Sequence, residues 1–151
     1  MQSFAHLPPT PQKIVAQKPK TISSKEEFKV IKTHCMQGAN MLRRLENFED
    51  EPLLQTAYDI ARWHHERWDG RGYPDGLKGN DIPISAQIVS LADVYDALTS
   101  ERCYKKAFSH ETAMRMILNG ECGAFNPLLL ECLTDIQAEL QKKLQNITVN
   151  R

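Results

Sequence analysis

The sequence has no apolar run that reaches the roughly 18 residues of a membrane-spanning helix. Residues 1–6 also lack the charged stretch and the following apolar stretch that mark a secretory signal peptide. These two absences argue against a membrane-embedded or secreted protein. We therefore expect a cytoplasmic protein with no membrane partner.

An excess of charge of either sign is also missing. The 19 basic and 19 acidic residues give a formal net charge of +0 at pH 7. Binding to a nucleic-acid polymer usually relies on a positive field, which this balance does not supply. We expect no nucleic-acid polymer as partner, although a local basic patch is compatible with the composition.

Cysteine is scarce and irregularly spaced, and no two cysteines form a C-x-x-C pair. A disulfide framework or a cysteine-based zinc site would need a more regular pattern. We expect free thiols in a reducing compartment. The cysteines are Cys35, Cys103, Cys122 and Cys132.

Four of the eight prolines fall within residues 1–22. Because proline fixes its backbone angle and lacks an N–H donor, this stretch predicts an extended N-terminal arm. The remaining residues, 23–151, are enough for one globular domain with its own core.

Apolar residues in that domain recur at helical spacing, and no stretch alternates in the manner of a strand. The fold class we predict is all-α, a five-helix bundle with a long glycine-rich loop at 68–82 between the second and third helices. Helix N-caps are expected at Ser24, Ser109 and Asn126. The predicted helices span about 25–46, 50–67, 83–100, 110–119 and 126–144.

Each predicted helix carries an apolar stripe. In the first helix the stripe contains Phe28, Ile31 and Cys35, and the second helix should bury Leu53, Ala57 and Ile60. The third helix has the widest apolar arc, so we expect it to be the most buried of the five. That arc consists of Ile84, Ile88, Leu91, Ala92, Tyr95 and Leu98.

Polar side chains that can bind metal lie along these stripes. His64 continues the buried face of the second helix, and His65 could reach the same centre from one side. His34 lies at the edge of the first stripe and Asp93 just beyond the edge of the third. Taken singly, His34 also fits a partly buried histidine with satisfied hydrogen bonds, and Asp93 fits a cap or an ion-pair partner. Together they fit a metal site in a helical bundle.

These residues and their surroundings resemble the HD-GYP domain, a branch of the HD phosphohydrolase superfamily. The resemblance covers roughly residues 18–135 with family-like spacing, and its central motif is long enough to be highly specific. The matching segments are KTH at 32–34, HHERWDGRGYPDGLKG at 64–79, ADVYDALTS at 92–100 and RCYK at 102–105.

The resemblance implies an all-α bundle that holds two or three metal ions, often iron or manganese. It also implies hydrolysis of cyclic di-GMP to the linear dinucleotide or to GMP. Carried over position by position, it assigns metal binding to His34, His64, His65 and Asp93, phosphate binding to Arg102 and Lys105, and a substrate-side loop to Gly72, Tyr73 and Pro74. Tyr73 could stack on guanine or close the site, but it also fits a loop tyrosine packed on the body.

One defining element of that family is missing. The family carries a His-Asp pair before an N-terminal Lys-Pro, and aligning this landmark with Lys18 and Pro19 places the pair near Phe4 and Ala5. No histidine in this sequence is followed by aspartate. The pair's aspartate normally bridges two metals, so the resemblance predicts impaired hydrolysis. The remaining histidines could still hold a single ion, with zinc as one option.

Three interpretations remain open from the sequence. The chain is an impaired phosphodiesterase, a non-catalytic module that binds cyclic di-GMP or a protein, or a structural remnant. It is either a piece of a longer protein or a naturally degenerate domain. Loss of the N-terminal helices would expose apolar surface. We therefore expect a homodimer, a signalling protein as partner, or an arm that covers the gap.

Overall fold

The computed structural model describes residues 25–46, 48–101 and 106–149. Within these ranges the chain forms five α-helices and one 3-10 helix, η1 (Gly79–Asp81), and no strand. The all-α prediction is confirmed for the described residues. The predicted arm and the Ser24 cap lie outside them. The helices are α2 (Lys25–Arg43), α3 (Pro52–Trp63), α4 (Ile84–Thr99), α5 (His110–Leu118) and α6 (Pro127–Val149).

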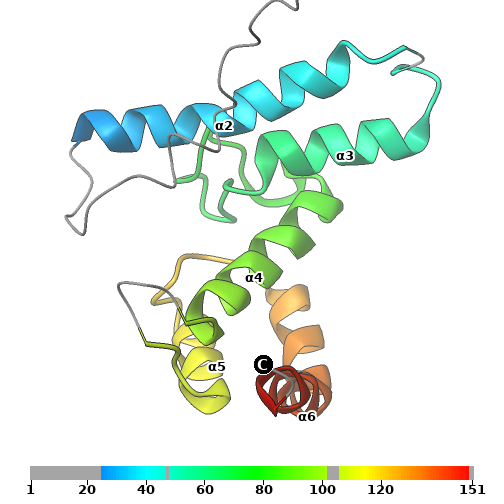
Figure 1. The fold of residues 1–151 in the computed structure, drawn as a ribbon. Coiled ribbons are helices and arrows are strands. Elements are labelled where there is room, and N and C mark those ends of the chain that lie inside the picture. The colour runs from blue at the N-terminus through cyan, green and yellow to red at the C-terminus, as the bar shows by residue number, and fades with distance from the viewer. Residues whose placement is uncertain (1–24, 47, 102–105, 150–151) are drawn as a thin grey trace, which may run out of the picture.

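The helices form two pairs joined by α4. In Figure 1, α2 and α3 lie side by side at one end of the molecule, and α5 and α6 lie at the other. Helix α4 runs between the pairs and contacts both α3 and α5. None of the described helices has the length and apolar character needed to cross a membrane.

Small side chains bring α2 and α3 close together. Cys35 and Ala39 on α2 are fully buried. A Cβ built on Gly38 would lie 3.5 Å from the Cβ of Ala61 on α3, which is ordinary van der Waals contact. Close approach of the two backbones follows from these small residues, and it positions the C-terminal end of α3 beside the middle of α2.

The main hydrophobic core lies among α4, α5 and α6, away from the α2–α3 pair. It holds α4 in place through Leu91 and Leu98, which pack with residues of the two following helices. Its buried members are Leu91, Leu98, Ala113, Met114, Ile117 and Leu133. The third predicted helix contributes to the core, but only through one side; the expectation that it is the most buried helix is wrong, because a larger share of the residues of α5 is buried.

Two predicted caps are confirmed. The Ser109 hydroxyl accepts a hydrogen bond from the backbone N–H of Thr112 at 3.2 Å, at the start of α5. The Asn126 side-chain oxygen accepts one from the N–H of Leu128 at 3.0 Å, at the start of α6. The same amide donates its Nδ2 to Gln87 Oε1 at 2.9 Å. An aspartate at position 126 would lack that donor.

Several residues predicted to be buried are exposed. Leu53 is 77% exposed, because Tyr58 is the residue of α3 that turns inward, with its ring against Phe48 and Trp63. Ile84 and Ile88 are also exposed, because the first turns of α4 bury Ala86 and Gln87 on the opposite side. On α2, Phe28 and Ile31 are exposed while Cys35 is buried.

Candidate metal centre

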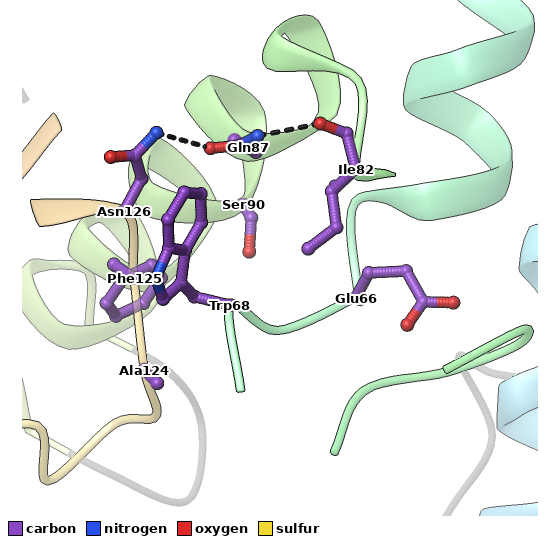
Figure 2. Close-up of a pocket in the computed structure, with 8 residues that line it drawn as sticks. All are labelled: Glu66, Trp68, Ile82, Gln87, Ser90, Ala124, Phe125 and Asn126. Atoms are coloured by element: carbon purple, nitrogen blue, oxygen red, sulfur yellow. Dashed lines mark hydrogen bonds between the residues drawn. The ribbon is translucent and has the colours of Figure 1, made fainter. Parts of the chain in front are cut away.

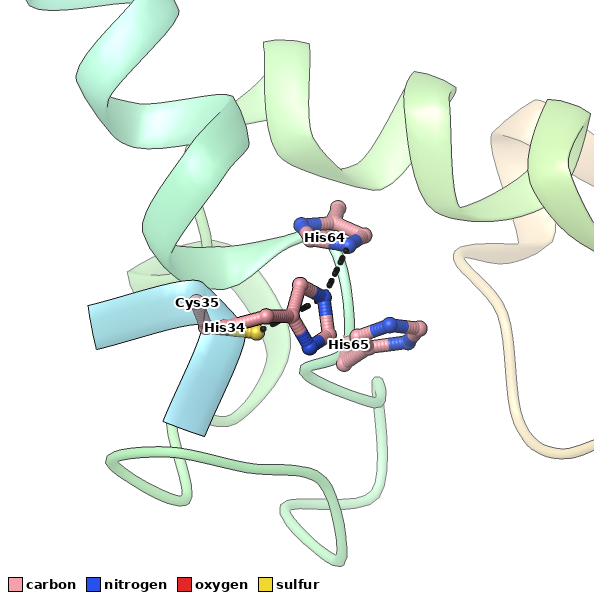
Figure 3. Close-up of side chains that lie close together, drawn as sticks. All are labelled: His34, Cys35, His64 and His65. Atoms are coloured by element: carbon pink, nitrogen blue, oxygen red, sulfur yellow. Dashed lines mark hydrogen bonds between the residues drawn. The ribbon is translucent and has the colours of Figure 1, made fainter. Parts of the chain in front are cut away.

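Three histidines predicted to meet do meet. His34 comes from α2, and His64 and His65 follow the last residue of α3. One ring nitrogen of each histidine and the sulfur of Cys35 all lie within 4.8 Å of one another. Figure 3 shows the three rings gathered where the end of α3 passes beside α2. The close packing of these two helices thus builds the cluster.

Hydrogen bonds fix the orientation of two of these rings. His34 Nδ1 lies 2.6 Å from the carbonyl oxygen of Ile31, and His64 Nδ1 lies 2.8 Å from that of Ile60. A carbonyl oxygen can only accept, so each neutral ring must carry its proton on Nδ1. Metal-binding histidines commonly show this arrangement, because it leaves Nε2 free as a ligand.

The two free nitrogens face each other. His34 Nε2 and His64 Nε2 are 3.2 Å apart. With both protons on Nδ1, two lone pairs point into the same small space and repel each other. A cation shared by the two nitrogens would relieve this repulsion.

His65 completes the cluster as a half-buried ring. Its centroid lies 4.1 Å from that of His64 and 5.0 Å from that of His34. Burial, and after it the neighbouring His64 and His34, lowers the pKa of His65 to about 4. His65 is thus neutral at pH 7, which is the protonation state that binds metal.

The second predicted helix ends earlier than expected, at Trp63 and not near residue 67. His64 is the C-cap, and the chain then turns so that the side chain of Glu66 is buried, with 3% exposed. Glu66 Oε1 accepts hydrogen bonds from the backbone N–H groups of Asp75 at 2.7 Å and Gly76 at 2.9 Å. Because a buried carboxylate needs such donors, the helix gives way to a turn that supplies them.

The glycine-rich loop folds back onto this turn. The N–H of Tyr73 donates to the carbonyl oxygen of His65 at 3.2 Å, and the Tyr73 ring stacks on the His65 ring with centroids 4.8 Å apart. Lys32 on α2 places its Nζ 4.8 Å from the centre of the Tyr73 ring. Burial raises the pKa of Tyr73 to about 12. Tyr73 is therefore a neutral side chain that borders the histidine cluster.

Asp75 anchors the same loop to the end of α3. Arg62 donates to both of its carboxylate oxygens, at 2.8 and 3.0 Å, and Trp63 Nε1 donates to Oδ2 at 2.7 Å. The hydrogen bond from Arg62, and with it that from Trp63, holds the pKa of Asp75 below its ordinary value. Two residues of α3 that directly precede His64 thus fix the loop.

We expect Asp75→Asn to lower the free energy of unfolding at pH 7 by about 1–2 kcal/mol. Hydrogen bonds to charged groups contribute about 1.5–3 kcal/mol, and solvent screening of this partly exposed pair reduces that. Because the folded-state pKa lies below the unfolded value near 3.9, the stabilisation is complete above about pH 5. It is lost as the pH falls through the folded-state pKa.

Urea denaturation of both proteins at pH 7 and near pH 3 measures this difference. The control is Glu139→Gln, which removes an exposed ion pair with Lys143 on α6 and should change stability little. If the difference in free energy of unfolding between wild type and Asp75→Asn stays constant with pH, the stabilising role of the ionised Asp75 carboxylate is contradicted.

The far end of the loop is tied to α4 and α6. Gln87 donates to the carbonyl oxygen of Ile82 at 2.7 Å and accepts from Asn126, as Figure 2 shows. The cavity beside these residues has a volume of only about 10 Å³. Small-molecule sites usually measure about 300–1,000 Å³, so this void is a packing feature and no nucleotide site.

The other predicted site residues stand apart from the histidine cluster. Asp93 is exposed on α4 and is not among the side chains that gather within 4.8 Å. It still affects the site, because its charge partly opposes the lowering of the His65 pKa by burial. Arg102 and Lys105 lie outside the described residues. Gly72 and Pro74 flank Tyr73 in the loop that packs on His65.

Sequence reasoning missed two features of the site. Cys35 was assigned to an apolar stripe, yet its sulfur lies 3.5 Å from His34 Nε2. Its position directly after His34 was the available signal. Burial raises the pKa of this thiol to about 11. The position of Lys32 over the Tyr73 ring depends on tertiary packing and had no local signal.

The donor set fits a divalent transition metal. Neutral imidazoles are the usual ligands of zinc and also suit iron, nickel and copper. The exposed position of His34 leaves the cluster accessible from solvent. Both the Nδ1 atoms beside backbone carbonyls and the facing Nε2 atoms fit a cluster that could hold a metal ion.

Comparison with known proteins gives consistent matches. A family model described as HD domain matches residues 7–124. A probable cyclic di-GMP phosphodiesterase of Vibrio cholerae is 44% identical over 108 residues, which is 70% of this chain and 24% of that protein. A cyclic di-GMP phosphodiesterase of Thermotoga maritima is 40% identical over 119 residues, 79% of this chain and 31% of that protein.

A third relative differs in its named substrate. A 3'3'-cGAMP-specific phosphodiesterase of Vibrio cholerae is 38% identical over 110 residues, 73% of this chain and 20% of that protein. The chain therefore spans about a quarter of the length of the curated relatives it matches.

Proposed function

Since this chain belongs to the HD domain family, and within it to the HD-GYP type, we propose that it is a metal-dependent phosphodiesterase domain that acts slowly on cyclic di-GMP. The observation that carries this proposal is the pair of facing Nε2 atoms of His34 and His64, 3.2 Å apart, beside His65 and Tyr73. A cation held there would lie next to the loop of Gly72, Tyr73 and Pro74, from which the HD-GYP type takes its name.

The chemistry of the cluster suits phosphodiester hydrolysis. A divalent ion, when bound, makes water a better nucleophile near neutral pH and offsets charge on a phosphate. In this chain His34, His64 and His65 would hold that ion, and we propose Asp93 as a further ligand from α4. The backbone carbonyls of Ile31 and Ile60 keep two of the rings in the binding tautomer.

Substrate recognition is proposed for the loop and its neighbours. Tyr73 presents an aromatic ring beside the cluster, and aromatic rings stack on nucleobases. Gly72 and Pro74 hold this tyrosine in place. Arg102 and Lys105 are the proposed partners of the two phosphates, because Arg and Lys bind phosphate oxygens with charge-assisted hydrogen bonds.

The missing His-Asp pair is the reason to expect slow turnover. A second ion would need a shared ligand, and no aspartate follows a histidine in this sequence. Catalysis that relies on two ions to stabilise both the attacking and the leaving oxygen would then lose one of them. We propose a single-ion site, occupied by iron, manganese or zinc. This site would bind cyclic di-GMP but hydrolyse it slowly.

Incubation of the purified chain with cyclic di-GMP and added manganese, iron or zinc tests the proposal. The expected result is slow formation of the linear dinucleotide or GMP, which His64→Ala abolishes. Parallel incubations with 3'3'-cGAMP decide between the two substrates named for the relatives. If a chain shown to contain metal forms no product with any of these ions, the proposed phosphodiesterase activity is contradicted.

The alternative is a module that binds cyclic di-GMP or a protein without hydrolysis. It is favoured by the absent His-Asp pair and by the exposed apolar residues of α2, which include Phe28, Val30 and Ile31. These side chains could also form a homodimer contact or dock a signalling protein. Nucleotide binding that survives His64→Ala would support this alternative. The free thiols of Cys35 and Cys132 favour a reducing cytoplasm for either function.

A further inference from the structure

We propose that the sulfur of Cys35 is a direct ligand of the metal ion and that the cluster is a single-ion site of three imidazoles and one thiolate, selective for zinc. This inference rests on the proposed function only for the location of the metal site. It assigns a fourth ligand on α2 to a residue that neither the sequence pattern nor the proposed mechanism uses.

The two separations that involve His34 Nε2 match the edges of a tetrahedral zinc site. With Zn–N bonds of about 2.0–2.1 Å and Zn–S bonds of about 2.3 Å, the edges of a tetrahedron are about 3.3 Å between two nitrogens and about 3.6 Å between nitrogen and sulfur. The observed separations are 3.2 Å for His34 Nε2 and His64 Nε2, and 3.5 Å for His34 Nε2 and Cys35 Sγ. His65 would have to bring one ring nitrogen closer to supply the fourth donor, since the cluster as a whole spans up to 4.8 Å.

Packing alone accounts less well for the position of the sulfur. Buried cysteines often act as small apolar residues, and Cys35 is fully buried between α2 and α3. An apolar role would place the sulfur against alkyl groups. Here one of its contacts, at 3.5 Å, is polar: His34 Nε2, the same atom that already faces His64 Nε2. The sulfur, as Figure 3 shows, belongs to the histidine cluster.

The donor set determines which ion binds and what the site can do. Thiolate ligands favour zinc over manganese or magnesium, which prefer oxygen donors. On binding, the S–H bond of Cys35 breaks, its proton passes to solvent buffer, and a sulfur–metal bond forms. Four protein donors complete a tetrahedron, as in structural zinc sites, with Cys35 in the position proposed above for Asp93, so one donor must leave before water can bind. Zinc would therefore stabilise the α2–α3 pair and restrain hydrolysis.

The test uses the complete chain, stripped of metal and reloaded with Co²⁺ or Zn²⁺. Cobalt-loaded wild type should show a near-ultraviolet sulfur-to-cobalt charge-transfer band, which Cys35→Ser lacks. Competition with a chromophoric chelator should show that Cys35→Ser weakens zinc binding at least about 10-fold, because loss of even an outer partner of a ligand costs about 10–100-fold. The matched control Cys132→Ser removes an exposed thiol on α6 and should change neither readout.

A cobalt spectrum of wild type without the sulfur band would overturn the inference, whether or not the variant folds. Unchanged zinc affinity in a folded Cys35→Ser chain would do the same. Neither readout depends on turnover. A chain that hydrolyses cyclic di-GMP without the band refutes the cysteine ligand alone. One that shows the band without hydrolysis refutes the proposed phosphodiesterase alone.

Discussion

Replacing His64 by alanine should lower the metal content of the purified chain at least about 10-fold. Its Nε2 lies 3.2 Å from His34 Nε2, and its Nδ1 is already hydrogen-bonded to the carbonyl oxygen of Ile60. Removing a direct ligand should cost at least as much affinity as removing an outer partner, which costs about 10–100-fold. Elemental analysis after exhaustive dialysis against metal-free buffer measures the change.

The matched control is His110→Asn. His110 is a buried histidine, and its Nδ1 bonds to the Tyr95 hydroxyl at 2.8 Å, where α4 meets α5. That variant should keep the metal content of wild type even if it loses stability. Equal metal content in the His64→Ala and wild-type chains would show that the histidine cluster is not where the metal binds.

Substituting alanine for Gly72 should lower the free energy of unfolding by about 3 kcal/mol, at the upper end of overpacking costs. A Cβ at this position would lie 2.4 Å from the Cα of Glu66 and 2.5 Å from the backbone nitrogen of Arg67. Backbone atoms cannot rotate away as a flexible side chain can. The loop must therefore move off the turn that follows α3.

Amide hydrogen exchange locates that movement. The N–H of Tyr73 bonds to the carbonyl oxygen of His65, and the N–H of Asp75 bonds to Glu66, so both should exchange faster in Gly72→Ala. The control is Gly38→Ala on α2, whose Cβ would make an ordinary 3.5 Å contact with Ala61. It should be neutral or stabilising by up to about 1 kcal/mol, since glycine is unfavourable within a helix. Equal effects of the two substitutions would contradict the close packing of Gly72.

Local sequence signals predicted the five described helices and the caps of α5 and α6. Ser109 and Asn126 act as N-caps because their side-chain oxygens reach backbone N–H groups two or three residues ahead. The predicted end of α3 was wrong, because the observed end depends on a contact with residues that lie further along the sequence. Glu66 takes its hydrogen bonds from Asp75 and Gly76, and no periodicity within residues 50–67 encodes those donors.

Burial was harder to predict than helix position. Apolar spacing identified the face of each helix but not the length over which a neighbour covers it. Ile84 and Ile88 continue the arc of Leu91 and Leu98, yet they lie beyond the part of α4 that packs against α5 and α6. Leu53 is exposed for a similar reason at the first turn of α3.

The candidate site was likewise predictable only in part. The motif around His64 and the helical position of His34 were sufficient to predict that three imidazoles meet. The hydrogen bonds that orient the rings, and the nearness of the Cys35 sulfur, depend on how closely α2 and α3 pack. Such distances cannot be derived from the spacing of residues along either helix.

We propose that a metal ion lies between His34 and His64. Crystals of the zinc-loaded chain, measured on both sides of the zinc absorption edge, test this position directly. We expect an anomalous peak about 2.0–2.1 Å from the Nε2 atoms of both histidines. Zinc bound elsewhere, with the two nitrogens still about 3.2 Å apart and no peak between them, would show that a shared proton holds the rings together.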